Sequence, residues 1–363
     1  MIRTRRRGRP RPIKINKSRR EQSFVPTVLL RSAAESSCGG VGVDASISCM
    51  TSASGVRIGW AELPHEVRSA VEAIIGGTVV EAVSQVGGFS PGTADRVRTA
   101  EGRRAFVKAV SPAQNERSVE MHRREARVTA ALPASVPVPQ FLGCYDDGEW
   151  VALVLQDIQG HHPATPWVPD ELDRVLTALD DLAGSLTPPP LPDVKTAADL
   201  LAEDFAGWHR ISTDPPTDLH PWAARHLDEL RALADRGLAA LTGDTLVHTD
   251  IRADNILLSR EGTVTILDWP WACRGPAWLD TLLLLINTRL YGGHDTHALL
   301  TSRAAATGAD PHDLIAVLTG LAGYFTDTAR QPPPKGLPTL RAFQRAHADT
   351  VLSWLREIPT PAN

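Results

Sequence analysis

The chain has 363 residues, of which 42 % are hydrophobic and 22 % are charged, a composition typical of globular proteins. This length accommodates two domains or one domain of two lobes. No apolar run is long enough to cross a membrane, and the first thirty residues contain no apolar segment of a secretion signal. Four scattered cysteines form neither a metal-ligand spacing nor a disulfide framework, so we expect a cytoplasmic protein without a membrane partner.

The net charge of −4 is distributed unevenly along the chain. Residues 1–56 carry eleven Lys and Arg against three acidic residues, which leaves a net charge of −12 on the remainder. An acidic body argues against nucleic acid as the partner of the main domain. It could steer a cationic substrate towards a site, although an acidic surface also simply keeps a protein soluble.

Residues 1–56 are the first predicted region. Most of their basic residues lie in 1–22, which contain almost no apolar side chains, and 31–56 are small, polar and glycine-rich. Because such a composition cannot bury a core, we expect a disordered arm. The arm could contact nucleic acid or a membrane. We favour the alternative that it is upstream sequence from a start site placed too early, with the true start near Met50 or Val56.

Ordered structure is expected from about Trp60. Apolar residues at helical spacing predict a helix over 62–75, and strands are predicted over 79–86, 94–97 and 104–110. A glycine-rich turn, GGFSPG at 87–92, lies between the first two strands. Its glycines would let the backbone close over phosphate oxygens and bind them through N–H groups. Three strands with this turn follow the order of a kinase amino-terminal lobe.

The third strand carries a single lysine, Lys108. A strand lysine is usually a surface residue, but apolar neighbours on both sides favour a side chain that faces a cleft. A charged helix is predicted over 114–132, and a kinase requires from it a Glu that pairs with the lysine. Glu116, Glu120 and Glu125 are the candidates.

The second half of the chain is mainly helical. After an apolar strand at 150–155, helices are predicted over 169–186, 196–211, 221–241, 276–290, 295–307, 310–329 and 337–357. The expected fold is α+β, with a small antiparallel-sheet lobe at 57–157 that has one key helix. A larger helical lobe is expected at 158–363.

A strand–turn–strand segment at 244–271 carries the candidate chemistry. Asp250 and Asn255 have the offset of a kinase catalytic loop, and Asp268 ends the second strand. In phosphoryl transfer, a carboxylate accepts the proton of the acceptor hydroxyl, while an amide and a second carboxylate hold magnesium against the phosphates. A hairpin with polar ends is usually only a hairpin. Asn, however, occurs five times in the whole chain, and one of the five lies at the required offset.

The strings HTDIRADNIL at 248–257 and VTILDW at 264–269 resemble the aminoglycoside phosphotransferase family, small-molecule kinases with a protein-kinase-like two-lobed fold. The resemblance extends over about residues 57–360. Thr249 stands where the family often has Gly, and no Gly closely follows Asp268. These departures affect the substrate and the loop shape, because every group that the chemistry needs is kept.

The resemblance implies roles in catalysis. Asp250 would position or deprotonate the acceptor hydroxyl, and Asn255 and Asp268 would bind Mg2+. Arg252 would stabilise the transferred phosphate, although an ion pair with Asp254 or Glu261 is an equally good explanation of its presence. His248 would serve packing, and Asp280 would hold the catalytic loop by hydrogen bonds.

The resemblance also implies a site for ATP. Lys108 would draw the phosphates into place, oriented by Glu125, which lies in an RREA string at 123–126 that is frequent in the family. Gly88 and Gly92 of the glycine-rich turn would lie over the phosphates. The backbone of Gln156 and Ile158 would form the hinge that binds adenine.

The implied function is transfer of the γ-phosphate of ATP to a hydroxyl of a small molecule, an aminoglycoside-like antibiotic or another metabolite, by a monomer or homodimer. A protein kinase is an alternative, but Asp280 follows Asp268 by only twelve positions, too few for an activation segment with an A-P-E element. An inactive nucleotide-binding protein would usually lack the lysine, the catalytic carboxylate or a metal ligand. Here Lys108, Asp250, Asn255 and Asp268 are all present. A P-loop kinase is excluded because no G-x-x-x-x-G-K-[ST] motif occurs.

The acceptor itself is left open by the sequence. Asp199, Glu203 and Asp204 could meet a polyamine antibiotic, but their helical spacing favours a solvated helix face.

Removal of the arm should leave the protein intact. A chain that begins at Val56 is expected to keep its melting temperature and its ATP affinity, because residues 1–56 contain no candidate site residue and cannot bury a core. Thermal unfolding and calorimetry on the two chains test this. A loss of more than a few degrees would show that the arm packs on the fold.

Overall fold

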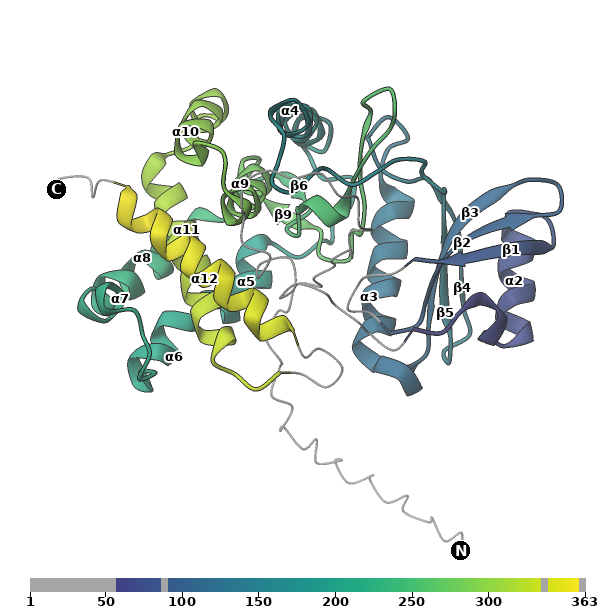
Figure 1. The fold of residues 1–363 in the computed structure, drawn as a ribbon, viewed down its shortest axis with the longest axis horizontal. Helices are drawn as coiled ribbons and strands as arrows, with labels where there is room; N and C mark the ends of the chain where they lie inside the picture. The colour runs from purple at the N-terminus through teal and green to yellow at the C-terminus, as the bar shows by residue number, and fades with distance from the viewer. Residues whose placement is uncertain (1–56, 86–90, 334–338, 359–363) are drawn as a thin grey trace, which may run out of the picture.

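The computed structural model describes residues 57–85, 91–333 and 339–358. The arm expected over 1–56 and the candidate Gly88 lie outside these residues. A sheet of antiparallel strands occupies one end of an elongated molecule, and a body of helices occupies the other (Figure 1).

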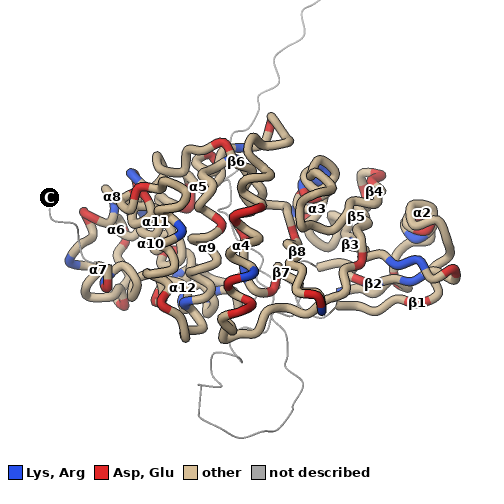
Figure 2. Tube along the Cα trace, turned by 90° about the horizontal axis from the view of Figure 1, so that it is seen from above, with Lys and Arg blue, Asp and Glu red and all other residues tan. Residues whose placement is uncertain are grey.

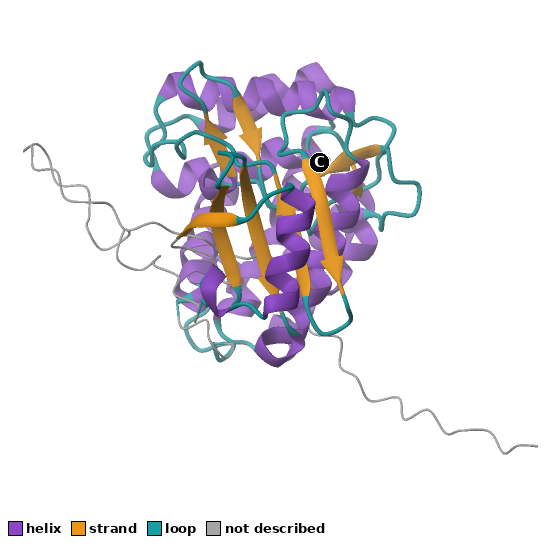
Figure 3. Ribbon diagram, turned by 90° about the vertical axis from the view of Figure 1, so that its right-hand side faces the viewer, coloured by secondary structure: helices purple, strands orange, loops and turns teal. Residues whose placement is uncertain are grey.

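The sheet has the strand order β1-β2-β3-β5-β4. Its strands are β1 (Val79–Ser84), β2 (Thr93–Thr99), β3 (Arg104–Val110), β4 (Phe141–Asp146) and β5 (Val151–Leu155). Alternate residues of β2 are buried, as expected for a strand that is covered on one face. That face packs under η1 (Trp60–Glu62) and α2 (His65–Ile75), where Val71 meets a core that includes Val97 and Val107. Figure 3, which looks onto this end of the molecule, shows a helix in front of the strands.

Helix α3 (Pro112–Ala131) covers the other face of the sheet. Ser111 and Gln114 form a capping box at its start and Pro112 takes the first helical position, and the helix is kinked at Asn115, whose φ and ψ are not helical. Ala126 packs with Leu153 and Leu155 of β5, so this side of the helix faces the strands. Glu125 lies on the buried side of α3.

The helical body is built around α11. Its helices are α4 (Pro169–Ser185), α5 (Ala197–Phe205), α6 (Gly207–Thr213), α7 (Pro221–Arg225), α8 (Leu227–Ala240), α9 (Leu279–Tyr291), α10 (Thr296–Thr307), α11 (Pro311–Ala329) and α12 (Leu340–Glu357). Every residue of α11 from Ala316 to Ala329 is buried, and α5, α6, α8 and α12 pack around it. Its small residues Gly320 and Gly323 make room for the rings of Phe205 and Trp208.

Two helices expected from the sequence are each divided into two. The helix predicted over 196–211 is interrupted at Ala206, and the helix predicted over 221–241 is interrupted at His226. Close packing accounts for the first break, because Gly207 lies directly against the backbone of Gly323 and the indole N–H of Trp208 donates to the Thr319 carbonyl at 2.8 Å. Gly207 is the only local sign of this break in the sequence, and it is a weak one, because a single glycine within a helical pattern is often tolerated.

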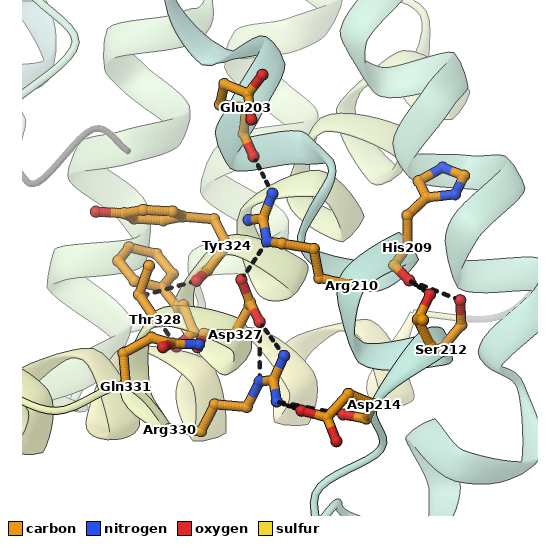
Figure 4. Close-up of polar contacts among 12 residues, drawn as sticks. Glu203, His209, Arg210, Ser212, Asp214, Tyr324, Asp327, Thr328, Arg330 and Gln331 are labelled. Atoms are coloured by element: carbon orange, nitrogen blue, oxygen red, sulfur yellow. Dashed lines mark hydrogen bonds and ion pairs between the residues drawn. The ribbon is translucent and has the colours of Figure 1, made fainter. Parts of the chain in front are cut away.

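Ion pairs join the helices of the body, where acidic and basic positions are interspersed (Figure 2). The Asp327 carboxylate of α11 accepts from Arg210 Nε of α6 at 2.6 Å and from Arg330 Nε at 2.9 Å. Arg330 also donates to the Asp214 carboxylate at 2.7 Å, and Arg210 to the Glu203 carbonyl at 2.8 Å. Figure 4 shows this network beside Tyr324, so it fixes α5 and α6 against α11.

Two short two-stranded sheets lie between α8 and α9 in the sequence order. Strand β6 (Thr245–Val247) pairs with β9 (Cys273–Gly275), and β7 (Ile256–Leu258) pairs with β8 (Val264–Ile266). The hairpin turn contains Gly262 at φ +82°, a value that favours glycine. The second strand ends two residues before Asp268, so this residue belongs to the loop that follows β8.

The expected α+β fold with a small sheet lobe and a larger helical lobe is confirmed. No helix among residues 57–85, 91–333 and 339–358 is long and apolar enough to cross a membrane.

The close packing at α11 leads to a stability prediction. A Cβ added at Gly323 would lie 2.6 Å from Cδ1 of the buried Trp208 ring, so Gly323→Ala should lower the free energy of unfolding by ~1–3 kcal/mol. Gly184→Ala in α4 is the matched control, because nothing lies within 4 Å of its added Cβ. It should be neutral or stabilise by up to ~1 kcal/mol. Urea unfolding measures both, and equal effects would contradict the packing argument.

Candidate active site

The loop that carries Asp250 is anchored by Asp280, at the start of α9. The Asp280 carboxylate accepts from the backbone N–H of His248 at 2.7 Å and of Thr249 at 2.9 Å. Thr249 has φ +63°, a strained value for a β-branched residue, and its hydroxyl donates to the Trp271 carbonyl at 2.8 Å. The role expected for Asp280 is therefore confirmed: it holds a backbone conformation that Thr249 would not adopt alone.

His248 is a fixed structural residue in this loop. Its Nδ1 accepts from the backbone N–H of Asp250 at 3.1 Å, which places the proton on Nε2, and Nε2 donates to the Leu267 carbonyl at 2.8 Å. Burial lowers the pKa of His248 to about 4. A neutral ring with both nitrogens engaged links the Asp250 loop to the loop of Asp268 and is not a general base.

Asp250 lies in a buried polar group with Asn255 and Arg252. The Asn255 amide donates to the Asp250 carbonyl at 2.8 Å and to its Oδ2 at 3.2 Å. The Arg252 guanidinium contacts Asp250 Oδ1 and donates to both oxygens of Asp254, at 3.1 and 3.2 Å. Burial raises the pKa of Asp250, and the charge of Arg252 opposes this. Of the two ion-pair partners considered from the sequence, Asp254 and Glu261, Arg252 therefore pairs with Asp254.

Lys108 lies between two carboxylates. Its Nζ donates to both oxygens of Glu125 and to Asp268 Oδ1, each at 2.8 Å. Burial opposes the charge of Lys108, but Asp268 and Glu125 outweigh it and raise its pKa. Burial also opposes ionisation of Asp268, but the charge of Lys108 outweighs it and the pKa of Asp268 is lowered. At Glu125 burial is the larger effect, and it raises the pKa to about 7 although Lys108 acts in the opposite direction.

The helix register around Glu125 follows from these contacts. Of the three candidate acids of α3, Glu125 is buried against Lys108, whereas Glu116 and Glu120 are exposed. Strand β3, helix α3 and the loop after β8 therefore bring their charged groups to one point. Asp268 also has φ +67°, a second strained residue at this site.

Asn255 and Asp268 are suited to Mg2+ by their chemistry. Carboxylate and amide oxygens are the ligands that this ion prefers, and it commonly keeps waters and phosphate oxygens as further ligands. Because the Asn255 amide nitrogen is turned to Asp250, its Oδ1 is directed away from that carboxylate. Among the described residues no group of three or more His, Cys, Asp or Glu could hold a metal. Two ligands of this kind fit a metal that arrives with a nucleotide.

The other nucleotide candidates lie at the ends of two interior strands of the sheet. Gly92, at φ +109°, precedes β2, and a Cβ there would collide with the Ala109 carbonyl, so a larger residue is excluded. Gln156 follows β5, and its backbone N–H donates to Gln140 O at 2.9 Å. The Ile158 carbonyl accepts from Arg96 at 3.1 Å.

Several residues near the site carry no signal in the sequence. Tyr324 of α11 is buried, and the negative charges of Asp204 and Asp250 act on it. Arg117 and Arg124 of α3 lie over the Trp271 ring, 5.4 and 5.7 Å from its centroid. These contacts join α3 to the loop that follows Asp268. Residues so far apart in the chain show no common spacing that could have revealed them.

One sequence expectation about this region is wrong. Asp204 is 1 % exposed and does not lie on a solvated face, whereas Asp199 and Glu203 are exposed as expected. Along α5, Asp204 follows Ala197 and Leu201 on the side that faces the body. Helical spacing of acidic residues alone does not tell which of them the body will cover.

The comparisons with known proteins agree with this geometry. A family model described as the phosphotransferase enzyme family matches residues 87–317. No curated protein sequence matches the chain.

Three solved structures share the fold. The aminoglycoside phosphotransferase of Alicyclobacillus acidocaldarius is 16 % identical with a TM-score of 0.50, over 81 % of this chain and 96 % of that one. A thermostable mutant of aminoglycoside phosphotransferase APH(4)-Ia, in complex with ADP and hygromycin B, is 18 % identical with a TM-score of 0.54, over 81 % and 100 %. Spectinomycin phosphotransferase APH(9)-Ia, in complex with ADP and spectinomycin, is 12 % identical with a TM-score of 0.51, over 83 % and 96 %.

The family match covers well over half of the chain, and the fold is that of aminoglycoside phosphotransferases. The chain therefore belongs to the phosphotransferase enzyme family.

Proposed function

We propose that this protein transfers the γ-phosphoryl group of ATP to a hydroxyl group of a small molecule. The observation that carries the proposal is the convergence of Lys108 with Asp268 and Asp250, which come from β3 and from two loops of the segment 244–271 and are tied to one another. Lys108 binds Asp268 at 2.8 Å, and His248 links the loops of Asp250 and Asp268. Phosphoryl transfer depends mainly on positioning and electrostatic stabilisation, which such a rigid set supplies.

In the proposed reaction, the nucleotide phosphates lie against Lys108 and the acceptor hydroxyl against Asp250. Mg2+, held by Asn255 and Asp268, would neutralise charge on the phosphates. Glu125 keeps the Lys108 ammonium directed at them. Asp250 orients the hydroxyl and takes its proton, while Asn255 holds the carboxylate in place through its amide.

For Arg252 we propose a positioning role, the alternative that the sequence left open. Its guanidinium is occupied by Asp250 and Asp254, and its charge raises the acidity of Asp250 against the effect of burial. We infer that it opposes protonation of Asp250 and orients the carboxylate.

The acceptor is proposed to lie beside Asp250, the group that would take its proton. The two phosphotransferase structures with bound antibiotics hold hygromycin B and spectinomycin, both small molecules. Residues 269–278 between Asp268 and α9 are too few to form a docking segment for a protein substrate. A hydroxylated antibiotic or metabolite is thus favoured over a protein.

We also retain the division of the chain as a proposal. Residues 57–157 would bind the nucleotide and 158–363 the acceptor, in a cytoplasmic monomer or homodimer.

A screen of ATP consumption over aminoglycosides, macrolides, amino alcohols and sugars, with product mass as confirmation, tests the function directly. In this assay Asp250→Asn should reduce turnover by ~10²–10⁴, because an amide cannot take the proton. Binding of a non-hydrolysable ATP analogue with Mg2+, measured by calorimetry, should stay close to the wild type. Asp268→Asn should instead weaken that binding, since it removes a metal ligand. Near-normal turnover by Asp250→Asn would contradict the proposed kinase chemistry.

The ion pair of Lys108 provides a second prediction. Lys108→Ala removes a charge aimed at the phosphates and should weaken nucleotide binding by roughly 10–100-fold. Glu125→Gln should act in the same direction but more weakly, because the lysine remains. Glu120→Gln on the exposed side of α3 is the matched control and should bind as the wild type does. Loss of binding in the control alone would show that Glu125 is not the functional partner.

A further inference from the structure

The register of the sheet defines a row of side chains beside Lys108. Arg96 of β2 pairs with Val83 of β1 and with Phe106 of β3, and Phe106 pairs with Leu155 of β5. Directly paired residues of antiparallel strands point to the same face. Since Phe106 and Lys108 are two residues apart, this row shares the face of Lys108 and lies about 7 Å along the strands from it.

This row lies where the base of a nucleotide would be found if Lys108 holds its phosphates. It is on the face opposite to α2, and it leads to Leu155, the last residue before the hinge at Gln156. Arg96 is its polar member, and its side chain is 27 % exposed.

Arg96 is fastened to the hinge by two contacts. Its Nε donates to Asp157 Oδ1 at 2.6 Å, and its NH2 group donates to the Ile158 carbonyl at 3.1 Å. Asp157 is only 2 % exposed and also accepts from Arg104 Nε at 2.7 Å. A buried carboxylate with two guanidinium partners holds Arg96 in one orientation, so the cation stays at the Ile158 carbonyl.

The two purines place opposite demands on a hinge. The edge of adenine offers an amino donor and a ring nitrogen acceptor, whereas guanine offers a carbonyl acceptor beside N–H donors. To bind at Ile158, guanine would accept from the backbone N–H of Ile158 through its own carbonyl, and would donate its ring N–H to the backbone carbonyl of Ile158. At that carbonyl, the N–H donors of guanine would face the N–H donors of Arg96. Adenine can use the Ile158 N–H and a different carbonyl, such as that of Gln156.

We propose that Arg96, held by Asp157, determines nucleotide specificity by making the site select adenine over guanine. The inference rests on the proposed function, because it assumes a nucleotide with its phosphates at Lys108. It adds a specificity residue that lies outside the catalytic groups.

Calorimetry with ADP and GDP tests the proposal on the full chain. The wild type should bind ADP at least about tenfold more tightly than GDP, and Arg96→Gln should reduce that ratio by about tenfold, mainly through a gain in GDP affinity. Asp157→Asn keeps the guanidinium but loosens it, so the ratio should move in the same direction by a smaller factor. Tripolyphosphate, which lacks a base, should bind equally to wild type and variants.

Arg98→Gln is the matched control. Arg98 lies on the same strand and face but pairs with the exposed Glu81, at 2.6 Å, and does not contact the hinge. Its ADP-to-GDP ratio should equal that of the wild type. A wild type that binds both nucleotides equally, or an unchanged ratio in Arg96→Gln and Asp157→Asn, overturns the proposal while the phosphotransferase function stands. A wild type that binds neither nucleotide overturns both.

Discussion

The contact of Lys108 with two carboxylates is the interaction on which the rest of the site depends. A buried ammonium is costly unless it is paired, and here both partners lie at 2.8 Å. Each partner comes from a different element, so the sheet, α3 and the loop after β8 are tied at one point. Loss of either carboxylate would remove one of the two partners of Lys108 and would loosen the helix or the loop that carries it.

Backbone strain is concentrated around this contact. Thr249 and Asp268 are the two residues other than glycine with positive φ among the described residues, and both adjoin or belong to the candidate catalytic set. Asp280 and His248 supply the hydrogen bonds that hold these conformations. The helical body acts as the rigid support, since α9, which carries Asp280, packs against α12, which in turn packs against the buried α11.

The sheet lobe has its own anchoring at the hinge. Asp157 joins β2, β3 and the hinge through Arg96 and Arg104, while Lys108 joins β3 to α3 and to the Asp268 loop. Base recognition and phosphate recognition are thus proposed to rest on two separate buried carboxylate networks on one face of the same sheet. Each can be altered without removing the other.

Local patterns in the sequence determined the elements and the catalytic hairpin. Strand β3 could be predicted from its apolar and β-branched residues. Asp250 and Asn255 are close in the sequence and contact each other in the structure, because both lie in one short loop. The tertiary structure alone decided the burial of Asp204, the breaks at Ala206 and His226, the partners of Arg252 and the contact of Arg96 with Asp157. These features depend on which surfaces of distant segments meet, and contacts between positions 61 residues apart leave no periodic trace in the chain.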